Sequence, residues 1–170
     1  GDVYKRQRLY TRNEYLAMVD YARQEIPDVT FSADVIVGFP GETEADFQDT
    51  LEVVRRVKYD QLFSFKYSER PGVPAAKLPD DVPTEEKKRR LARLMAVQDE
   101  VWSEQAAACV GAVWQGVVEG AARRPEGSVR MRTANNRKVV LPGRGLAIGQ
   151  PVRARVTGCR NTTFTGEVLA

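Results

Sequence analysis

Residues 32–43, with the sequence SADVIVGFPGET, decide the fold of the first half of the chain. The run of β-branched and apolar residues before Gly38 predicts a strand. Its nearly continuous apolar character is typical of a strand buried on both faces of a parallel sheet. Gly38 and Gly41 permit the turn that follows, and Thr43 is suited to cap a helix. The stretch therefore predicts one strand-to-helix unit of an α/β fold.

The surrounding sequence repeats this unit. A first helix is expected from Thr11, where TRNE has the form of a capping box, to Pro27. A second helix is expected from Thr43, and LFSFKYS at residues 62–68 predicts another strand. The order helix, strand, helix, strand indicates a parallel sheet. The residues expected to face its core are Leu16, Val19 and Ile26 in the first helix and Phe47, Leu51, Val54 and Val57 in the second.

The second half follows a different pattern. Four prolines in residues 70–83, RPGVPAAKLPDDVP, predict a crossing loop without regular structure. A charged amphipathic helix is then expected from Thr84 to about Cys109. Its inward residues would be Leu91, Leu94, Val101 and Trp102. The segments AVWQGVVEG, SVRMRT, RKVVLPG, PVRARVTG and FTGEVL follow. Five short alternating strands predict a small antiparallel, OB-like β-barrel that is closed or nearly closed.

These patterns divide the chain. We expect an α/β part at residues 8–80, a connecting helix at 81–108 and the all-β barrel at 109–170. Residues 1–7, GDVYKRQ, match neither pattern and are expected to be a non-native leader.

The predicted barrel is strongly basic. Residues 105–170 hold ten Lys and Arg against three Asp and Glu, a net charge of +7, although the whole chain carries only +3. Alternation along two strands places their arginines on the outer face, where they could be solvated charges or could contact phosphates of single-stranded or looped RNA. Phe164 is the best candidate for base stacking. The candidate RNA-binding residues are Arg130, Arg132, Asn135, Asn136, Arg137, Lys138, Arg153 and Arg155, with Arg144 and Arg160 adding charge.

A second candidate site lies where the predicted parallel strands end. Lys66 and Tyr67 follow the second strand, so they should share an end of the sheet with GFPGET. Ligands of α/β folds collect at that end, although a plain tight turn would use the same glycines. GFPGET lacks the GxxxxGK[ST] pattern of a phosphate loop. Asp34 lies within the apolar strand and should be either paired or functional, because an unpaired buried carboxylate is costly.

The composition excludes histidine-based catalysis and cysteine-based metal motifs from the chain. There is no histidine, and Cys109 and Cys159 lie too far apart in sequence for a zinc or iron–sulfur motif. We therefore predict no catalytic and no metal-binding residue here, and two unpaired thiols in a reducing cytoplasm. No apolar run is long enough to span a bilayer.

Three motifs resemble the second half of the radical S-adenosylmethionine (SAM) methylthiotransferases: SADVIVGFPGETEADFQDTLEVV, FSFKYSERPGVPAA and EEKKRRLARLMAVQDE. The sequence from VGAVWQGVVEG to TGEVL is similar to the C-terminal TRAM domain of that family. FSFKYSERPG and NNRKVVLPG look most like the tRNA 2-methylthio-N6-isopentenyladenosine synthases. Glu69 and Val73 depart from the Pro and Thr usual in that group.

The resemblance implies that the α/β part belongs to a radical SAM partial (βα) barrel. It implies a transferase that adds a methylthio group to C2 of N6-isopentenyladenosine next to the anticodon. SAM and two [4Fe–4S] clusters would serve the full-length parent, a cytoplasmic protein expected to be a monomer that binds the tRNA anticodon stem-loop. The cluster-binding cysteines are not in this chain, so alone it should be inactive, and the sulfur donor is not identified. Carried over by position, the residues beside SAM would be Ile36, Gly38, Phe39, Lys66 and Tyr67.

Alternative functions stay open. Related enzymes act on threonylcarbamoyl-adenosine in tRNA or on a ribosomal protein. The chain could also be a non-catalytic RNA-binding protein with an α/β scaffold, or a small-molecule enzyme with the barrel as a lid. A scaffold does not need GFPGET and KYSERPG at one sheet end, which favours an enzyme. An incomplete parallel barrel exposes strand edges, so we expect poor solubility when the chain is expressed alone.

Overall fold

A computed structural model describes residues 10–143 and 145–169 of the chain, which forms two compact units, Gly1–Trp102 and Ser103–Ala170. The predicted leader at residues 1–7 and the basic residue Arg144 lie outside the described residues. Each unit is described by itself.

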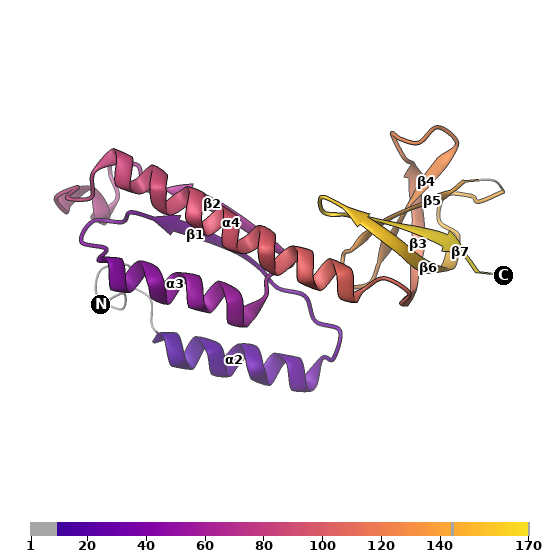
Figure 1. The fold of residues 1–170 in the computed structure, drawn as a ribbon, viewed down its shortest axis with the longest axis horizontal. Coiled ribbons are helices and arrows are strands. Elements are labelled where there is room, and N and C mark those ends of the chain that lie inside the picture. The colour runs from indigo at the N-terminus through magenta and orange to yellow at the C-terminus, as the bar shows by residue number, and fades with distance from the viewer. Residues whose placement is uncertain (1–9, 144, 170) are drawn as a thin grey trace. The chain divides into compact units, whose positions relative to one another are not determined.

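The first unit contains a two-stranded parallel sheet of β1 (Ser32–Val37) and β2 (Gln61–Lys66), with helices α2 (Arg12–Glu25) and α3 (Glu44–Val57) and most of α4 (Thr84–Ala108) (Figure 1). The predicted order of elements and the parallel pairing are confirmed. The predicted capping box at Thr11 and the predicted cap at Thr43 are confirmed, because each threonine side chain accepts from the third helical amide; Thr43 also forms a full capping box with Asp46.

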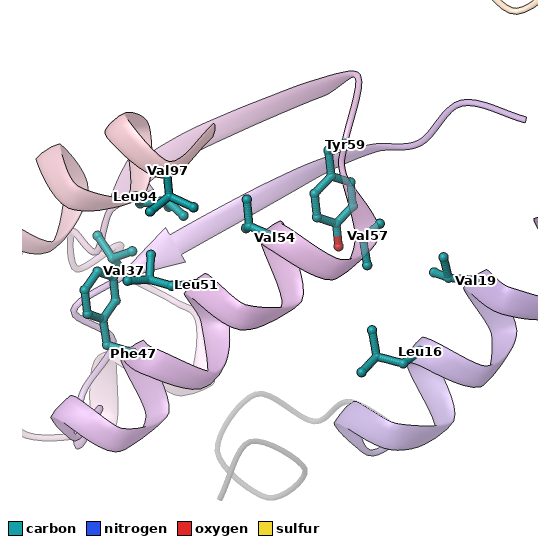
Figure 2. Packing of buried hydrophobic residues seen from close by; sticks show 10 residues of the cluster. All are labelled: Leu16, Val19, Val37, Phe47, Leu51, Val54, Val57, Tyr59, Leu94 and Val97. Atoms are coloured by element: carbon teal, nitrogen blue, oxygen red, sulfur yellow. The ribbon is translucent and has the colours of Figure 1, made fainter. Parts of the chain in front are cut away.

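The core of this unit lies between the helices and one face of the sheet. Phe47 and Leu51 of α3 meet Val37 of β1 and Leu94 of α4, and each of these side chains is at most 2% exposed (Figure 2). Burying one such side chain contributes about 1.5–3 kcal/mol. The α3 face predicted from sequence is confirmed, since all four of its apolar residues are buried.

The other face of the sheet is open, so the prediction that β1 is buried on both faces is wrong. Burial alternates along β1, leaving Asp34 exposed and Ile36 41% exposed. Phe63 and Phe65 of β2 lie opposite them in the register and are 53% and 52% exposed. The described helices cover only one face of the two strands. Asp34 therefore bears no burial cost in this chain.

Two local predictions also need correction. Ile26 is 56% exposed, because α2 ends at Glu25 and Ile26 adopts an extended backbone as its C-cap. The proline-rich loop is not wholly irregular, since residues Pro74–Lys77 form one short 3₁₀ helix. Proline at its first position presets the backbone and needs no amide donor there.

The second unit is a closed five-stranded barrel of β3 (Val113–Ala121), β4 (Ser128–Thr133), β5 (Lys138–Pro142), β6 (Pro151–Arg160) and β7 (Thr163–Val168). The predicted barrel is confirmed and is the closed one of the two forms expected, but it is not wholly antiparallel. The order β3-β4-β5-β7-β6 puts β7 beside β5, and these two strands run parallel. Gly116 allows close strand approach, because a Cβ there would lie 2.4 Å from the carbonyl oxygen of Arg132.

Phe164 belongs to the barrel core and is not a surface platform for bases. Its ring is 1% exposed and packs edge-on against Trp114 with ring centroids 4.8 Å apart. Within the described ranges, no helix combines the length and apolarity that crossing a bilayer requires.

Candidate cofactor-binding and nucleic-acid-binding sites

The carboxyl ends of β1 and β2 lie side by side. Val37 is in register with Lys66, and the amide of Tyr67 donates to the carbonyl oxygen of Val37 at 2.8 Å. The rings of Phe39 and Tyr67 then meet edge to face, with centroids 5.2 Å apart. Gly38 turns the chain away from the strand with a φ of 69°. The structure therefore brings together the two segments that the sequence placed at one sheet end.

The amides of the loop after β1 bond to carboxylates of the same chain. The amide of Gly38 donates to Glu42 Oε2 at 2.5 Å, and that of Gly41 donates to Asp81 Oδ1 at 2.6 Å. The amide of Thr43 donates to Asp46 at 2.9 Å. A phosphate would have to displace these carboxylates, in agreement with the missing phosphate-loop pattern.

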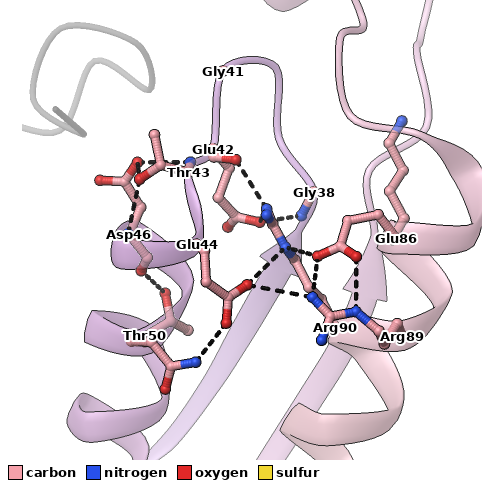
Figure 3. A network of polar contacts seen from close by, with 12 residues as sticks. Gly38, Gly41, Glu42, Thr43, Glu44, Asp46, Thr50, Glu86, Arg89 and Arg90 are labelled. Atoms are coloured by element: carbon pink, nitrogen blue, oxygen red, sulfur yellow. Dashed lines mark hydrogen bonds and ion pairs between the residues drawn. The ribbon is translucent and has the colours of Figure 1, made fainter.

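A buried ion pair joins α4 to this loop. Arg90 donates from one terminal nitrogen to Glu42 Oε2 at 2.8 Å and to the Glu42 carbonyl oxygen at 2.9 Å (Figure 3). Its Nε donates to Glu86 at 2.8 Å. The side chains of Arg90 and Glu42 are each 6% exposed. Hydrogen bonds from Arg89 and then Arg90 lower the pKa of Glu86 to about 2.

Lys87 covers the same sheet end one turn earlier on α4. It is 4% exposed, its Nζ lies 2.6 Å from both carboxylate oxygens of Asp80, and it sits 5.1 Å from the centre of the Tyr67 ring. The inward residues predicted for this helix are all apolar, so the prediction missed Lys87 and Arg90. Lys87 and Arg90 lie seven and four positions before the buried Leu94, on the same face of the helix. That spacing could have predicted that both side chains are buried.

The five predicted SAM contacts lie in three different environments. Ile36 and Lys66 are exposed, and Ile36 lies on the open face of the sheet. Phe39 and Tyr67 are 9% and 8% exposed and contact each other. At Gly38 a Cβ would lie 2.4 Å from Lys87 Cγ, so a lysine stem fills that space. Contact of these five residues with SAM stays a prediction; the structure shows only that they differ in exposure.

Cluster ligands are not gathered in the described part of the chain. No group of three His, Cys, Asp or Glu side chains with metal-binding geometry occurs in residues 10–143 and 145–169. Cys109 and Cys159 are half-buried thiols, and the Cys159 thiol donates to the carbonyl oxygen of Asn161 at 3.4 Å.

The outer surface of the barrel combines valines with arginines. Val113 lies opposite Arg155 on the neighbouring strand β6, and Gln115 lies opposite Arg153. Val113 is 41% exposed, Val117 is 45% exposed, and both arginines are exposed. We call Val113, Gln115, Val117, Arg153 and Arg155 the β3–β6 face.

Glu119 pairs with both arginines of β4. Its carboxylate accepts from Arg130 Nε at 3.0 Å and from Arg132 Nε at 2.8 Å. The hydrogen bond from Arg132, followed by that from Arg130, holds the pKa of Glu119 below its ordinary value of 4.5. Two of the ten basic residues counted from sequence are thus paired with one of the three acidic residues. The alternation in VWQGVVE places Glu119 on the same outer face as Val117. The sequence could therefore have predicted a carboxylate on the outer face of the barrel.

The loop between β4 and β5 uses its polar groups for its own turn. Thr133 Oγ1 donates to Asn135 Oδ1 at 2.6 Å, and Asn136 has a left-handed φ of 65°. The Arg137 guanidinium stacks 5.0 Å from the Trp114 ring and donates to Cys109 Sγ at 3.4 Å. Arg137 and Lys138 are half-buried, whereas Arg153 and Arg155 are exposed. The eight predicted RNA-binding residues therefore differ widely in their exposure and in how many of their donors already bond within the chain.

Comparison with known proteins places these sites in context. No protein-family model matches the chain. The tRNA-2-methylthio-N(6)-dimethylallyladenosine synthase of Moorella thermoacetica is 41% identical over 95% of the chain and 36% of the relative. The chain is thus homologous to these synthases along nearly its whole length. The synthases of Methylococcus capsulatus and a Thermoanaerobacter species are 42% and 38% identical over 96% and 97% of the chain.

The resemblance predicted from the motifs is confirmed by these synthases, and their names do not favour the alternative functions. The chain spans about a third of their length, 35–36% in these three relatives.

Proposed function

We propose that the chain is part of a tRNA methylthiotransferase that acts on the adenosine next to the anticodon. The product would carry a methylthio group at C2 of N6-isopentenyladenosine, the dimethylallyladenosine in the relatives' names. The observation that carries the proposal is the identity of 38–42% over 95–97% of the chain, which includes both candidate sites.

The first unit would supply part of a radical SAM partial barrel. Two parallel strands with helices on one face and apolar side chains on the other support this assignment. Ile36 would contact the adenine of SAM, with Lys66 near the same strand ends. Lys87 and Arg90 would keep the loop after β1 in place. When bound beside a [4Fe–4S] cluster held outside this chain, SAM would supply the radical that abstracts hydrogen from the substrate.

The barrel would bind the tRNA anticodon stem-loop. Arg153 and Arg155 are exposed beside Val113 and Val117, a combination suited to phosphates and riboses. Phe164 is buried, so stacking of bases on it is not part of the proposal. The barrel would thus grip the RNA backbone.

A chimeric enzyme tests the activity. The matching region of the Moorella thermoacetica synthase is replaced by this chain, and the chimera is expressed in a host without its own synthase. Mass spectrometry of tRNA nucleosides should detect 2-methylthio-N6-isopentenyladenosine. A purified chimera that binds SAM and tRNA but forms no such product would contradict the proposed reaction. Loss of SAM binding would contradict the role of the sheet end.

Salt dependence of RNA binding tests the barrel. The 170-residue chain is titrated against a fluorescent anticodon stem-loop at several KCl concentrations. If about three or four cations neutralise phosphates, the slope of log K against log[salt] should be about −2 to −3 on single-stranded RNA. A flat dependence would contradict RNA binding by the barrel.

A further inference from the structure

Glu119, Arg130 and Arg132 form a hydrogen-bonded cluster on the outer surface of the barrel, which we call the Glu119 cluster. The carboxylate accepts from Arg130 Nε at 3.0 Å and from Arg132 at 2.8 and 3.2 Å. The three side chains are 27–41% exposed, so the cluster faces solvent. Net charge alone would assign the same role to both arginines.

The two arginines are bonded differently. Arg132 uses all three nitrogens: two donate to Glu119, and the third donates to Asn136 Oδ1 at 2.9 Å and to its carbonyl oxygen at 3.3 Å. Arg130 donates to Glu119 from Nε. Its two terminal nitrogens make no hydrogen bond with the described residues. Arg132 thus bonds through all three of its nitrogens, whereas Arg130 bonds through Nε and presents its terminal edge to solvent.

From this asymmetry we infer that Arg130 is a phosphate ligand of the barrel and that Glu119 and Arg132 are positioning residues that hold its guanidinium. The inference rests on the proposed RNA-binding function and names the group that contacts the backbone. A guanidinium held at Nε keeps two donors free for the paired oxygens of a phosphate. Holding it in place also reduces the side-chain freedom lost on binding.

A purely electrostatic role for Glu119 predicts the opposite sign. If the arginines act only as diffuse positive charge, removal of a carboxylate beside them should tighten RNA binding. If Glu119 positions Arg130, then Glu119→Ala should weaken binding about 3- to 10-fold although the chain becomes more basic. The direction of the change therefore separates the two roles.

Glu167 provides a matched control for charge. It is an exposed carboxylate on β7, in register with Arg155 beside the β3–β6 face, and no hydrogen bond or ion pair of its side chain is found within the described residues. Glu167→Ala removes the same charge as Glu119→Ala without touching the Glu119 cluster. Its RNA affinity should stay equal to that of the unmodified chain or increase.

The experiment measures affinity of the 170-residue chain for the fluorescent stem-loop in a double-mutant cycle. Arg130→Gln should weaken binding and make the salt slope shallower by about 0.7 to 0.9. In the Arg130→Gln background, Glu119→Ala should have no further weakening effect, since the residue that it positions is gone. Circular dichroism confirms that each variant is folded, and Glu119→Gln replaces Glu119→Ala if the latter does not fold.

Two results would overturn the inference: tighter binding by Glu119→Ala, or equal weakening with and without Arg130. A folded, unmodified chain that shows no salt-dependent RNA binding would instead refute the proposed function of the barrel, so the two failures are distinguishable.

Discussion

Replacement of Arg90 by methionine should strongly destabilise the first unit. Arg90 and Glu42 are each 6% exposed, and their charged atoms lie 2.8 Å apart. Arg90→Met keeps an apolar stem of similar length but removes the guanidinium that pairs with the Glu42 carboxylate. Removal of one partner from a buried ion pair costs about 3–5 kcal/mol.

The neighbouring Arg89 gives a control with a different expected magnitude. Its side chain is 54% exposed and bonds to Glu86 at 2.7 Å. Ion pairs of that exposure contribute about 0–1 kcal/mol, because solvent screens them. Arg89→Met should therefore have several-fold less effect than Arg90→Met, although both variants lose one arginine from the same turn of α4.

Urea unfolding followed by helical ellipticity measures the difference, because α2, α3 and most of α4 belong to the first unit. With a denaturant slope of about 1–3 kcal/mol/M, the midpoint for Arg90→Met should fall by more than about 1 M. The double variant Glu42→Gln/Arg90→Met should recover part of the loss, since it also removes the buried carboxylate charge with which Arg90 pairs. Equal midpoints for Arg89→Met and Arg90→Met would refute the argument.

Three further predictions concern other parts of the chain. Phe65→Ser, on the open sheet face where Phe65 is 52% exposed, should reduce aggregation of the 170-residue chain in sedimentation experiments without changing its helicity; unchanged aggregation would contradict this. Gly116→Ala should lower barrel stability by about 1–3 kcal/mol in thermal melts, since its Cβ would lie 2.4 Å from the Arg132 carbonyl oxygen; a variant as stable as the parent would show that the strands can separate. NMR titration should give the Glu86 carboxyl a pKa near 2, and a higher pKa in Arg89→Met. The ionised carboxylate should stabilise the folded state fully above pH 4.5, and this contribution should be lost as the pH falls towards 2. A midpoint near 4.5 would contradict the arginine contacts.

Features under local control could be predicted from the sequence. The capping boxes at Thr11 and Thr43 involve residues three positions apart, and the apolar stripe of α3 follows from the helical period alone. The closed barrel followed from short alternating strands that cannot leave edges unpaired at low cost. For the caps and the α3 stripe, the determining residues are neighbours in sequence.

Features that depend on tertiary contacts were missed. Whether β1 is covered on one face or on two depends on what packs against it. An isoleucine at position 36 is compatible with either arrangement. The parallel pairing of β5 with β7 depends on how the barrel closes. Burial of Arg90 depends on Glu42, which lies 48 positions away. A single sequence carries little direct signal for such distant partners.

The basic charge of the barrel also depends on tertiary contacts for its effect. Composition gives residues 105–170 ten basic residues, which suggests a surface that is uniformly attractive to RNA. The structure instead pairs Arg130 and Arg132 with one carboxylate and stacks Arg137 on Trp114, while Arg153 and Arg155 remain exposed. A phosphate should bind most tightly to a guanidinium that still has free N–H donors and is already held in position. For the proposed RNA grip, the arrangement of hydrogen bonds around each guanidinium should therefore matter more than the net charge of +7.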